Sequence, residues 1–116
     1  MSRIRVLLAD DHAILRSGLR LLLEREQDLT VVGEATDGRA AVDWMDREQA
    51  DVAVMDVGMP GLNGIEATAQ ILKHSPHTGV LMLSMYSDER YVLRAVKAGA
   101  RGYLLKIGRA SCRERV

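Results

Sequence analysis

The sequence predicts a doubly wound α/β fold, with five parallel strands in one sheet and helices packed on its two faces. Short apolar runs alternate strictly with longer amphipathic segments, and no internal repeat or low-complexity linker interrupts them. Such alternation favours parallel strands joined by right-handed crossovers. A chain of 116 residues that is 47% hydrophobic is long enough for one domain around a single core.

The expected elements follow from local patterns. Leu15, Leu19 and Leu22 recur at helical spacing early in the chain, and Val92, Ala95 and Val96 do so near its end. Gly99 then supplies a helix stop. In chain order, strands are expected at 4–9, 29–36, 52–55, 80–83 and 102–105, and helices at 12–26, 39–49, 65–75 and 88–98.

The stretch 51–64 is the centre of this pattern. The apolar run at 52–55 predicts a buried strand that delivers Asp56 to its carboxyl end. A cluster of Gly, Pro and Asn residues then breaks regular structure before the next helical pattern begins at Ile65. In an open parallel sheet, chemistry takes place just outside the carboxyl ends of the strands. Asp56 is therefore the first candidate for a functional residue.

Other polar residues also follow predicted strands. Asp10 and Asp11 end the first strand, Ser84 ends the fourth and Lys106 ends the fifth, so all should project from the same edge as Asp56. In the strand order 2-1-3-4-5, the first and third strands are neighbours, and three carboxylates would crowd together. An oxygen-only ligand set without His or Cys suits Mg²⁺.

A metal beside a carboxylate, with a hydroxyl and a lysine near it, can handle a phosphoryl group. Mg²⁺ and Lys106 would neutralise the phosphoryl oxygens, Ser84 would donate a hydrogen bond and Asp56 would attack in line. His12, directly after the acidic pair, is interpreted as an exposed residue at the helix start and is given no role.

The chain from 4 to 106 resembles a response-regulator receiver domain. Four features carry the resemblance: the pair Asp10-Asp11, the run D-x-x-M-P-x-x-N-G at 56–64, Ser84, and the run K-A-G-A-R-G-Y-L-L-K at 97–106. D-D-H at 10–12, V-V-G-E-A at 31–35 and L-S-M-Y-S-D at 83–88 are most similar to the NarL/FixJ (LuxR-type) subfamily. The resemblance implies a flavodoxin-like (CheY-like) fold.

The resemblance also implies roles for single residues. Asp56 would accept a phosphoryl group from a sensor histidine kinase, and the domain would catalyse only its own phosphorylation and dephosphorylation, so it is not expected to be an enzyme. Ser84 and Tyr103 would occupy the switch positions. For Mg²⁺, the implied protein ligands are Asp11 and Asp56 directly, Asp10 through water, and the backbone carbonyl of Gly58.

Two alternatives remain open. One is an interaction-only receiver that no longer cycles phosphate, which the intact acidic set disfavours. The other is a phosphotransferase of the haloacid-dehalogenase kind, which also uses an Asp after a strand. That class needs a second acid two residues later, where this chain has Gly58.

The composition of the chain limits the kinds of partner that it is expected to bind. The formal net charge is zero, so no basic surface is expected to bind nucleic acid. In the resembled subfamily a helix-turn-helix output domain follows the receiver, so DNA would be bound only through a C-terminal domain absent from this sequence. No membrane segment or signal peptide is predicted, which indicates a cytoplasmic protein. A homodimer is left open.

The last ten residues depart from the receiver pattern. The string I-G-R-A-S-C-R-E-R-V at 107–116 has no apolar face, and it matches one translated frame of a widely used sequencing adapter. We therefore expect the receiver to occupy 1–106, truncated after its fifth strand with the fifth helix missing, and the tail to be non-native. The single cysteine, Cys112, lies in this tail, and one cysteine forms no intramolecular disulfide.

Overall fold

The computed structural model describes residues 3–84 and 89–105. Five parallel strands form one sheet in the order β2-β1-β3-β4-β5, which confirms the predicted topology. In chain order the elements are β1 (Ile4–Ala9), α1 (Ala13–Glu24), β2 (Leu29–Ala35), α2 (Gly38–Arg47), β3 (Val52–Asp56), α3 (Gly64–His74), β4 (Gly79–Ser84), α4 (Glu89–Ala98) and β5 (Gly102–Leu105).

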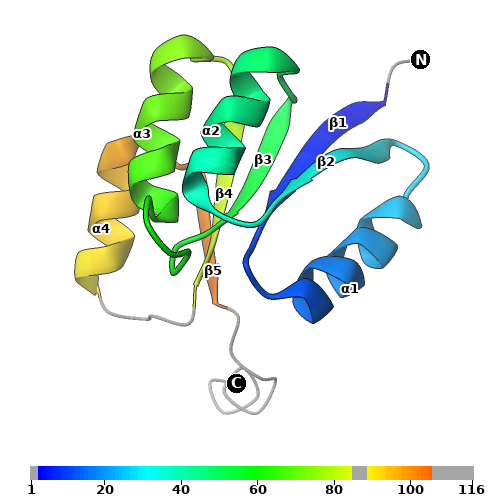
Figure 1. Cartoon of the computed structure of the whole chain (residues 1–116), viewed down its shortest axis with the longest axis horizontal. Coiled ribbons are helices and arrows are strands. Elements are labelled where there is room, and N and C mark those ends of the chain that lie inside the picture. The colour runs from blue at the N-terminus through cyan, green and yellow to red at the C-terminus, as the bar shows by residue number, and fades with distance from the viewer. Residues whose placement is uncertain (1–2, 85–88, 106–116) are drawn as a thin grey trace.

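The helices form two unequal layers. α2, α3 and α4 lie side by side on one face of the sheet, while α1 lies on the other face beside β1 and β2 (Figure 1). This is the doubly wound arrangement that alternating strands and helices predict. Among the described residues, no helix combines the length and the apolar character needed to cross a bilayer.

The hydrophobic core is also unequal. The larger cluster includes Leu7, Met55, Met82, Ile71 and Met45. Among the described residues, the smaller cluster has Val6, Leu8 and Val31 as buried members, with Leu19 and Leu23 of α1 packed against it. The face covered by α1 is therefore the less densely buried of the two.

Several predicted boundaries and faces need correction. α1 begins at Ala13 with His12 as its N-cap, because His12 has extended backbone angles, and it ends at Glu24 rather than at residue 26. α2 is shifted by one or two residues to 38–47. Leu22 and Val96, which belong to the apolar residues that recur at helical spacing, are 58% and 57% exposed. Helical spacing identifies an apolar stripe but does not show how much of it meets a partner.

Some predictions fall on residues that the structure does not describe. Lys106, the tail at 107–116 and the expected absence of a fifth helix lie outside the described residues. These remain predictions.

Candidate functional site

The carboxyl ends of β1 and β3 lie next to each other in the sheet. Ala9 of β1 pairs with Met55 of β3. Asp10 follows Ala9 and Asp56 follows Met55, so both acids lie at the same edge of the sheet. Both acids are 2% exposed. Two buried carboxylates so close together are costly unless polar or charged groups compensate them, which marks this edge as a functional site.

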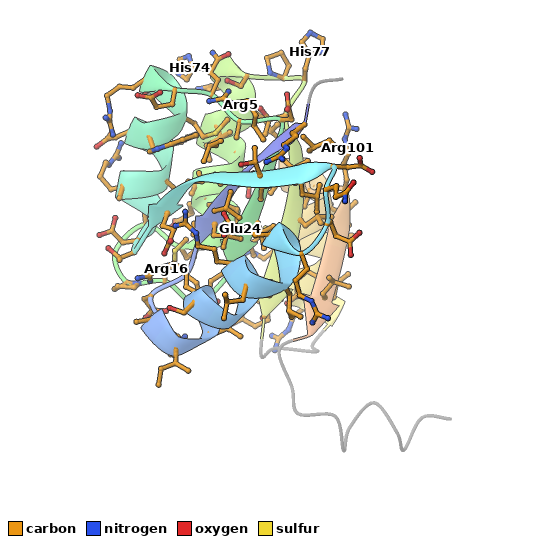
Figure 2. The ribbon with its side chains drawn as sticks, turned by 90° about the vertical axis from the view of Figure 1, so that its right-hand side faces the viewer. Arg5, Arg16, Glu24, His74, His77 and Arg101 are labelled. Atoms are coloured by element: carbon orange, nitrogen blue, oxygen red, sulfur yellow. The ribbon has the colours of Figure 1, made fainter. Side chains whose placement is uncertain are left out.

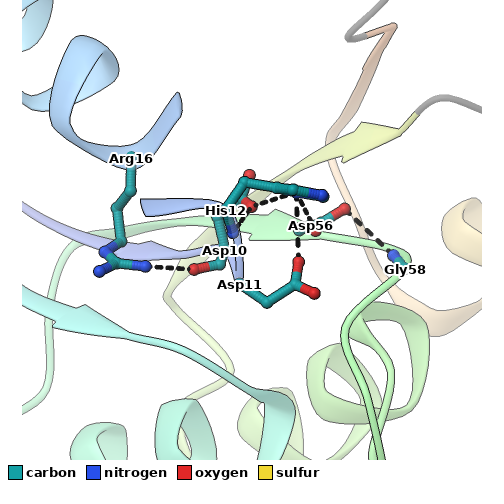
Figure 3. A network of polar contacts seen from close by, with 6 residues as sticks. All are labelled: Asp10, Asp11, His12, Arg16, Asp56 and Gly58. Atoms are coloured by element: carbon teal, nitrogen blue, oxygen red, sulfur yellow. Dashed lines mark hydrogen bonds and ion pairs between the residues drawn. The ribbon is translucent and has the colours of Figure 1, made fainter. Parts of the chain in front are cut away.

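The structure brings together all three predicted carboxylates. One ligand atom from each of Asp10, Asp11, Asp56 and His12 can be chosen so that all four lie within 4.8 Å of one another. Figure 3 shows these side chains converging at the ends of β1 and β3. The cluster can bind a metal ion, and its carboxylate oxygens are the hard ligands that Mg²⁺ prefers.

Backbone amides orient two of these carboxylates. The amide of Gly58 donates to Oδ1 of Asp56 at 3.1 Å, and the amide of His12 donates to Oδ1 of Asp10 at 2.8 Å. The other oxygen of Asp56, Oδ2, lies on the side of His12. Each carboxylate is thus held by the loop that follows its own strand, as the dashed contacts in Figure 3 show.

His12 lies beside the acidic pair, and its ring nitrogen faces the carboxylates. Its Nδ1 lies 3.1 Å from Oδ1 of Asp10, 3.3 Å from Oδ1 of Asp11 and 3.9 Å from Oδ2 of Asp56. The predicted position of His12, exposed at the helix start near the site, is confirmed, since it is the N-cap of α1 and its side chain is 59% exposed. The oxygen-only ligand set stays a prediction.

Arg16 ties the site to α1 and β2. Its guanidinium donates to the backbone carbonyl of Asp10 at 2.6 Å and to the Glu34 carboxylate at 2.7 Å. Arg20, one turn further along α1, also binds Glu34. Hydrogen bonds from Arg16 and Arg20 lower the pKa of Glu34 below its usual value, and the hydrogen bond with Glu34 raises the pKa of Arg20.

Two local features, a helix cap and a close backbone contact, fix the loop between β3 and α3. Asn63 and Glu66 form a reciprocal capping box at the start of α3. Gly64 follows, and a Cβ at this position would lie 2.2 Å from the backbone oxygen of Asp56. Only glycine allows this close approach between the helix start and the strand end. The amide of Gly64 also donates to the carbonyl of Val57 at 3.1 Å.

The structure gives the positions of Ser84 and Tyr103 but does not test their predicted roles. Ser84 is the last residue of β4 and is fully buried, and its neighbour Leu83 pairs with Asp56. Tyr103 lies on β5 opposite Met82 and packs against the larger core cluster. The proposed role of the Gly58 carbonyl and the switch roles of Ser84 and Tyr103 remain predictions.

The acidic cluster lies at the switch point between β1 and β3 of a doubly wound sheet, which is where α/β domains of this class bind their ligands. Residues 6–113 match the response regulator receiver domain, so the chain belongs to that family. The transcriptional regulatory protein DegU of Brevibacillus brevis is 40% identical over 105 residues, which are 90% of this chain and 44% of that protein.

Two further relatives are response regulators by name. The response regulator UvrY of Escherichia coli is 41% identical over 103 residues, covering 89% of this chain and 47% of that protein. A LuxR-family two-component response regulator from Aurantimonas sp. SI85-9A1 superposes with a TM-score of 0.87 at 36% identity, covering 98% of this chain and 81% of that one. The chain spans about half the length of the curated relatives it matches.

Proposed function

We propose that this receiver accepts a phosphoryl group on Asp56 from a sensor histidine kinase, in a reaction that depends on Mg²⁺. The observation that supports the proposal is the position of Asp56, which is buried at the end of β3 with its carboxylate beside those of Asp10 and Asp11. In the transfer, a carboxylate oxygen of Asp56 bonds to phosphorus as the P–N bond of phosphohistidine breaks. Water later cleaves the acyl phosphate.

The chain's own residues have distinct tasks in this proposal. The Gly58 amide holds Oδ1 of Asp56 and so fixes the orientation of the attacking carboxylate. Asp11 and Asp56 would hold Mg²⁺ directly, Asp10 through water, and the Gly58 carbonyl would complete the protein ligands. Bound Mg²⁺ would offset the negative charge of the phosphoryl oxygens. Ser84 and Lys106 would bind the same oxygens.

Phosphorylation would act as a switch. The hydroxyl of Ser84 would move toward the phosphoryl group, and Tyr103 would rotate into the space that it leaves, which changes the surface of α4 and β5. Such a switch works only through contacts that differ between the two states. The output in a cytoplasmic regulator would be transcription, through a DNA-binding domain outside this sequence, as the names of the relatives suggest. The domain would act on itself alone and not as an enzyme, and a phosphorylation-dependent homodimer is compatible with this scheme.

A direct labelling experiment tests the proposal. Incubation with acetyl phosphate and Mg²⁺ should add one phosphoryl group to the wild-type chain, detected by intact-mass spectrometry. Asp56→Asn should abolish labelling, and Asp11→Asn should raise the Mg²⁺ concentration needed. Asp46→Asn, an exposed carboxylate on α2, is the matched control and should label like the wild type. Equal labelling of Asp56→Asn and wild type would refute the acceptor assignment.

The same preparation separates the two alternatives. An interaction-only receiver would bind its partner but take up neither phosphoryl group nor beryllofluoride with Mg²⁺. A haloacid-dehalogenase-like phosphotransferase would pass the phosphoryl group to water or a second substrate with steady turnover, whereas membership of the receiver family favours a single labelled aspartate.

A further inference from the structure

We infer that Arg16 is a positioning residue of the metal site. Its guanidinium holds the main chain at Asp10 and thereby sets where the carboxylates of Asp10 and Asp11 lie for Mg²⁺. The inference rests on the metal site of the proposed function, and it adds to that site a residue outside the ligand set.

The main chain of Asp10 is held on both of its polar groups. Asp10 lies beyond Ala9, the last residue of β1, yet it is buried. A buried backbone group needs a hydrogen-bond partner. The amide of Asp10 donates to the carbonyl of Ala35 at 3.0 Å, and its carbonyl accepts from Nη1 of Arg16 at 2.6 Å. Arg16 therefore satisfies the backbone oxygen of one of the acids of the site, as the dashed contact in Figure 3 shows.

Arg16 is itself held in place. Its Nε donates to Oε1 of Glu34 at 2.7 Å, and its side chain is only 16% exposed. A guanidinium is planar and donates in fixed directions, so two hydrogen bonds made at once set both its position and its orientation. Glu34 and Ala35 are the last two residues of β2. Both backbone groups of Asp10 are thus tied to the end of that strand, the amide directly and the carbonyl through Arg16.

Attachment of α1 to the sheet does not account for this arrangement. Arg20, one turn further along α1, also binds Glu34 and pairs with Glu24. Both arginines therefore connect the helix to β2. Of the two, Arg16 is the one that reaches the main chain of Asp10. That contact is what Arg16 adds, and it connects the helix to the acidic cluster.

The consequence for metal binding follows from the geometry that Mg²⁺ demands. Carboxylates that lie close together repel one another while no cation is bound. Mg²⁺ needs nearly ideal octahedral geometry with bonds of about 2.0–2.1 Å, so a small displacement of the segment at 10–11 weakens its binding. The hydrogen bond from Arg16 resists that displacement. Loss of Arg16 should therefore lower the affinity for Mg²⁺ although no ligand is removed.

The test measures Mg²⁺ binding to the untagged 116-residue chain by calorimetry at one fixed pH. Arg16→Gln should weaken binding about tenfold or more, the usual effect of removing a group that orients metal ligands. In labelling by acetyl phosphate, the Mg²⁺ concentration that gives half the maximal rate should rise by the same factor, while the rate at saturating Mg²⁺ stays close to that of the wild type. A loss of folded protein would instead lower the fraction of the chain that can be labelled.

Two other arginines are matched controls. Arg5 lies near the amino end of β1, at the opposite end of the sheet from Arg16, and its guanidinium donates to the backbone carbonyl of Gln49 (Figure 2). Arg5→Gln removes the same charge and the same kind of hydrogen bond, and it should leave the affinity for Mg²⁺ unchanged. Arg20→Gln removes a positive charge and a Glu34 contact from α1. It should weaken Mg²⁺ binding far less than Arg16→Gln does.

The inference is overturned if Arg16→Gln binds Mg²⁺ as tightly as the wild type, or if Arg5→Gln or Arg20→Gln weakens binding as much as Arg16→Gln. If circular dichroism shows that Arg16→Gln does not fold, Arg16→Lys decides instead. It keeps the charge but lacks the planar fork, so it should bind Mg²⁺ more weakly than the wild type, and wild-type affinity would overturn the inference.

Failure of the inference and failure of the proposed function give different results, because calorimetry of Mg²⁺ binding needs no phosphoryl group. Labelling of the wild type on Asp56, together with unchanged Mg²⁺ affinity in Arg16→Gln, would refute only the inference. Selective loss of Mg²⁺ affinity in Arg16→Gln, together with no labelling of the wild type, would refute only the proposed function.

Discussion

At the scale of single residues, close approach at Gly64 controls the shape of the site. A Cβ on this residue would lie 2.2 Å from the backbone oxygen and 2.8 Å from the carbonyl carbon of Asp56. These are backbone atoms, so no side-chain rotation can relieve the clash. The strand end that carries the Asp56 carboxylate would have to move.

Gly64→Ala should therefore destabilise the chain and disturb the site. We expect a loss of about 1–3 kcal/mol in the free energy of unfolding, the usual cost of overpacking, measured by urea denaturation. Gly18→Ala is the matched control, because a Cβ on that exposed helical glycine meets nothing within 4 Å. Gly18→Ala should raise the free energy of unfolding by about 0.5–1 kcal/mol. A Gly64→Ala variant as stable as the wild type would contradict the argument.

The positions of the carboxylates and of His12 were predictable, and the direction of the His12 ring was not. Asp10 and Asp56 each follow an apolar run, and parallel strands bring such positions to one edge whatever the details of packing. The direction of the His12 ring depends on the cap conformation of its own backbone and on acids from two strands. No periodic pattern encodes that direction, so sequence reasoning placed His12 near the site without giving it a task.

At the scale of elements, ion pairs as well as partial burial attach α1 to the sheet. None of its residues is fully buried, and Leu19 and Leu23 pack only partly against the small core cluster. The ion pairs of Arg16 and Arg20 with Glu34 connect the helix to β2. The spacing of Leu15, Leu19 and Leu22 correctly predicted a helix but overestimated the width of its buried face.

Glu34→Gln should weaken this attachment in a pH-dependent way. Because Arg16 and Arg20 lower the pKa of Glu34 in the folded state, its contribution is complete above the ordinary value of 4.5 and is lost as pH falls through the folded value. At neutral pH we expect the variant to lose about 1 kcal/mol. The difference from wild type should shrink as pH falls below 4.5.

Chemical denaturation over a range of pH values measures this difference. Glu26→Gln, an exposed glutamate in the turn after α1, is the control and should follow the wild type. A stability difference for Glu34→Gln that stayed constant from neutral to acidic pH would show that the effect does not come from the carboxylate charge.

At the scale of the whole molecule, the two faces of the sheet are covered unequally. Among the described residues, α2, α3 and α4 lie on the face of the larger core cluster, whereas α1 lies on the face of the smaller cluster of Val6, Leu8 and Val31 (Figure 1). The topology was predictable because strand–helix alternation restricts it to few choices. The unequal cover of the two faces was not predictable. How much of a helix's apolar stripe is buried depends on which elements pack against it in three dimensions.

The 116-residue chain should accordingly be marginally stable or self-associating. Ile14, Leu21 and Leu22 on α1 are 90%, 69% and 58% exposed. Burial of an apolar side chain of this size would contribute roughly 1.5–3 kcal/mol of stabilisation, which is lost when the side chain stays in water. That is a large share of a total folding stability of about 5–15 kcal/mol. Sedimentation velocity should show association that increases with concentration, and thermal unfolding should be broad.

Polar substitution of this surface separates association from general instability. A triple variant with Ile14→Gln, Leu21→Gln and Leu22→Gln should sediment as a monomer and keep the circular dichroism of the wild type, because these side chains contribute little to the folded core. Gln at the exposed Leu93 and Val96 of α4 is the control, and it should leave association through α1 intact. A wild-type chain that is monomeric at all concentrations and melts sharply at high temperature would show instead that the exposed face of α1 needs no cover.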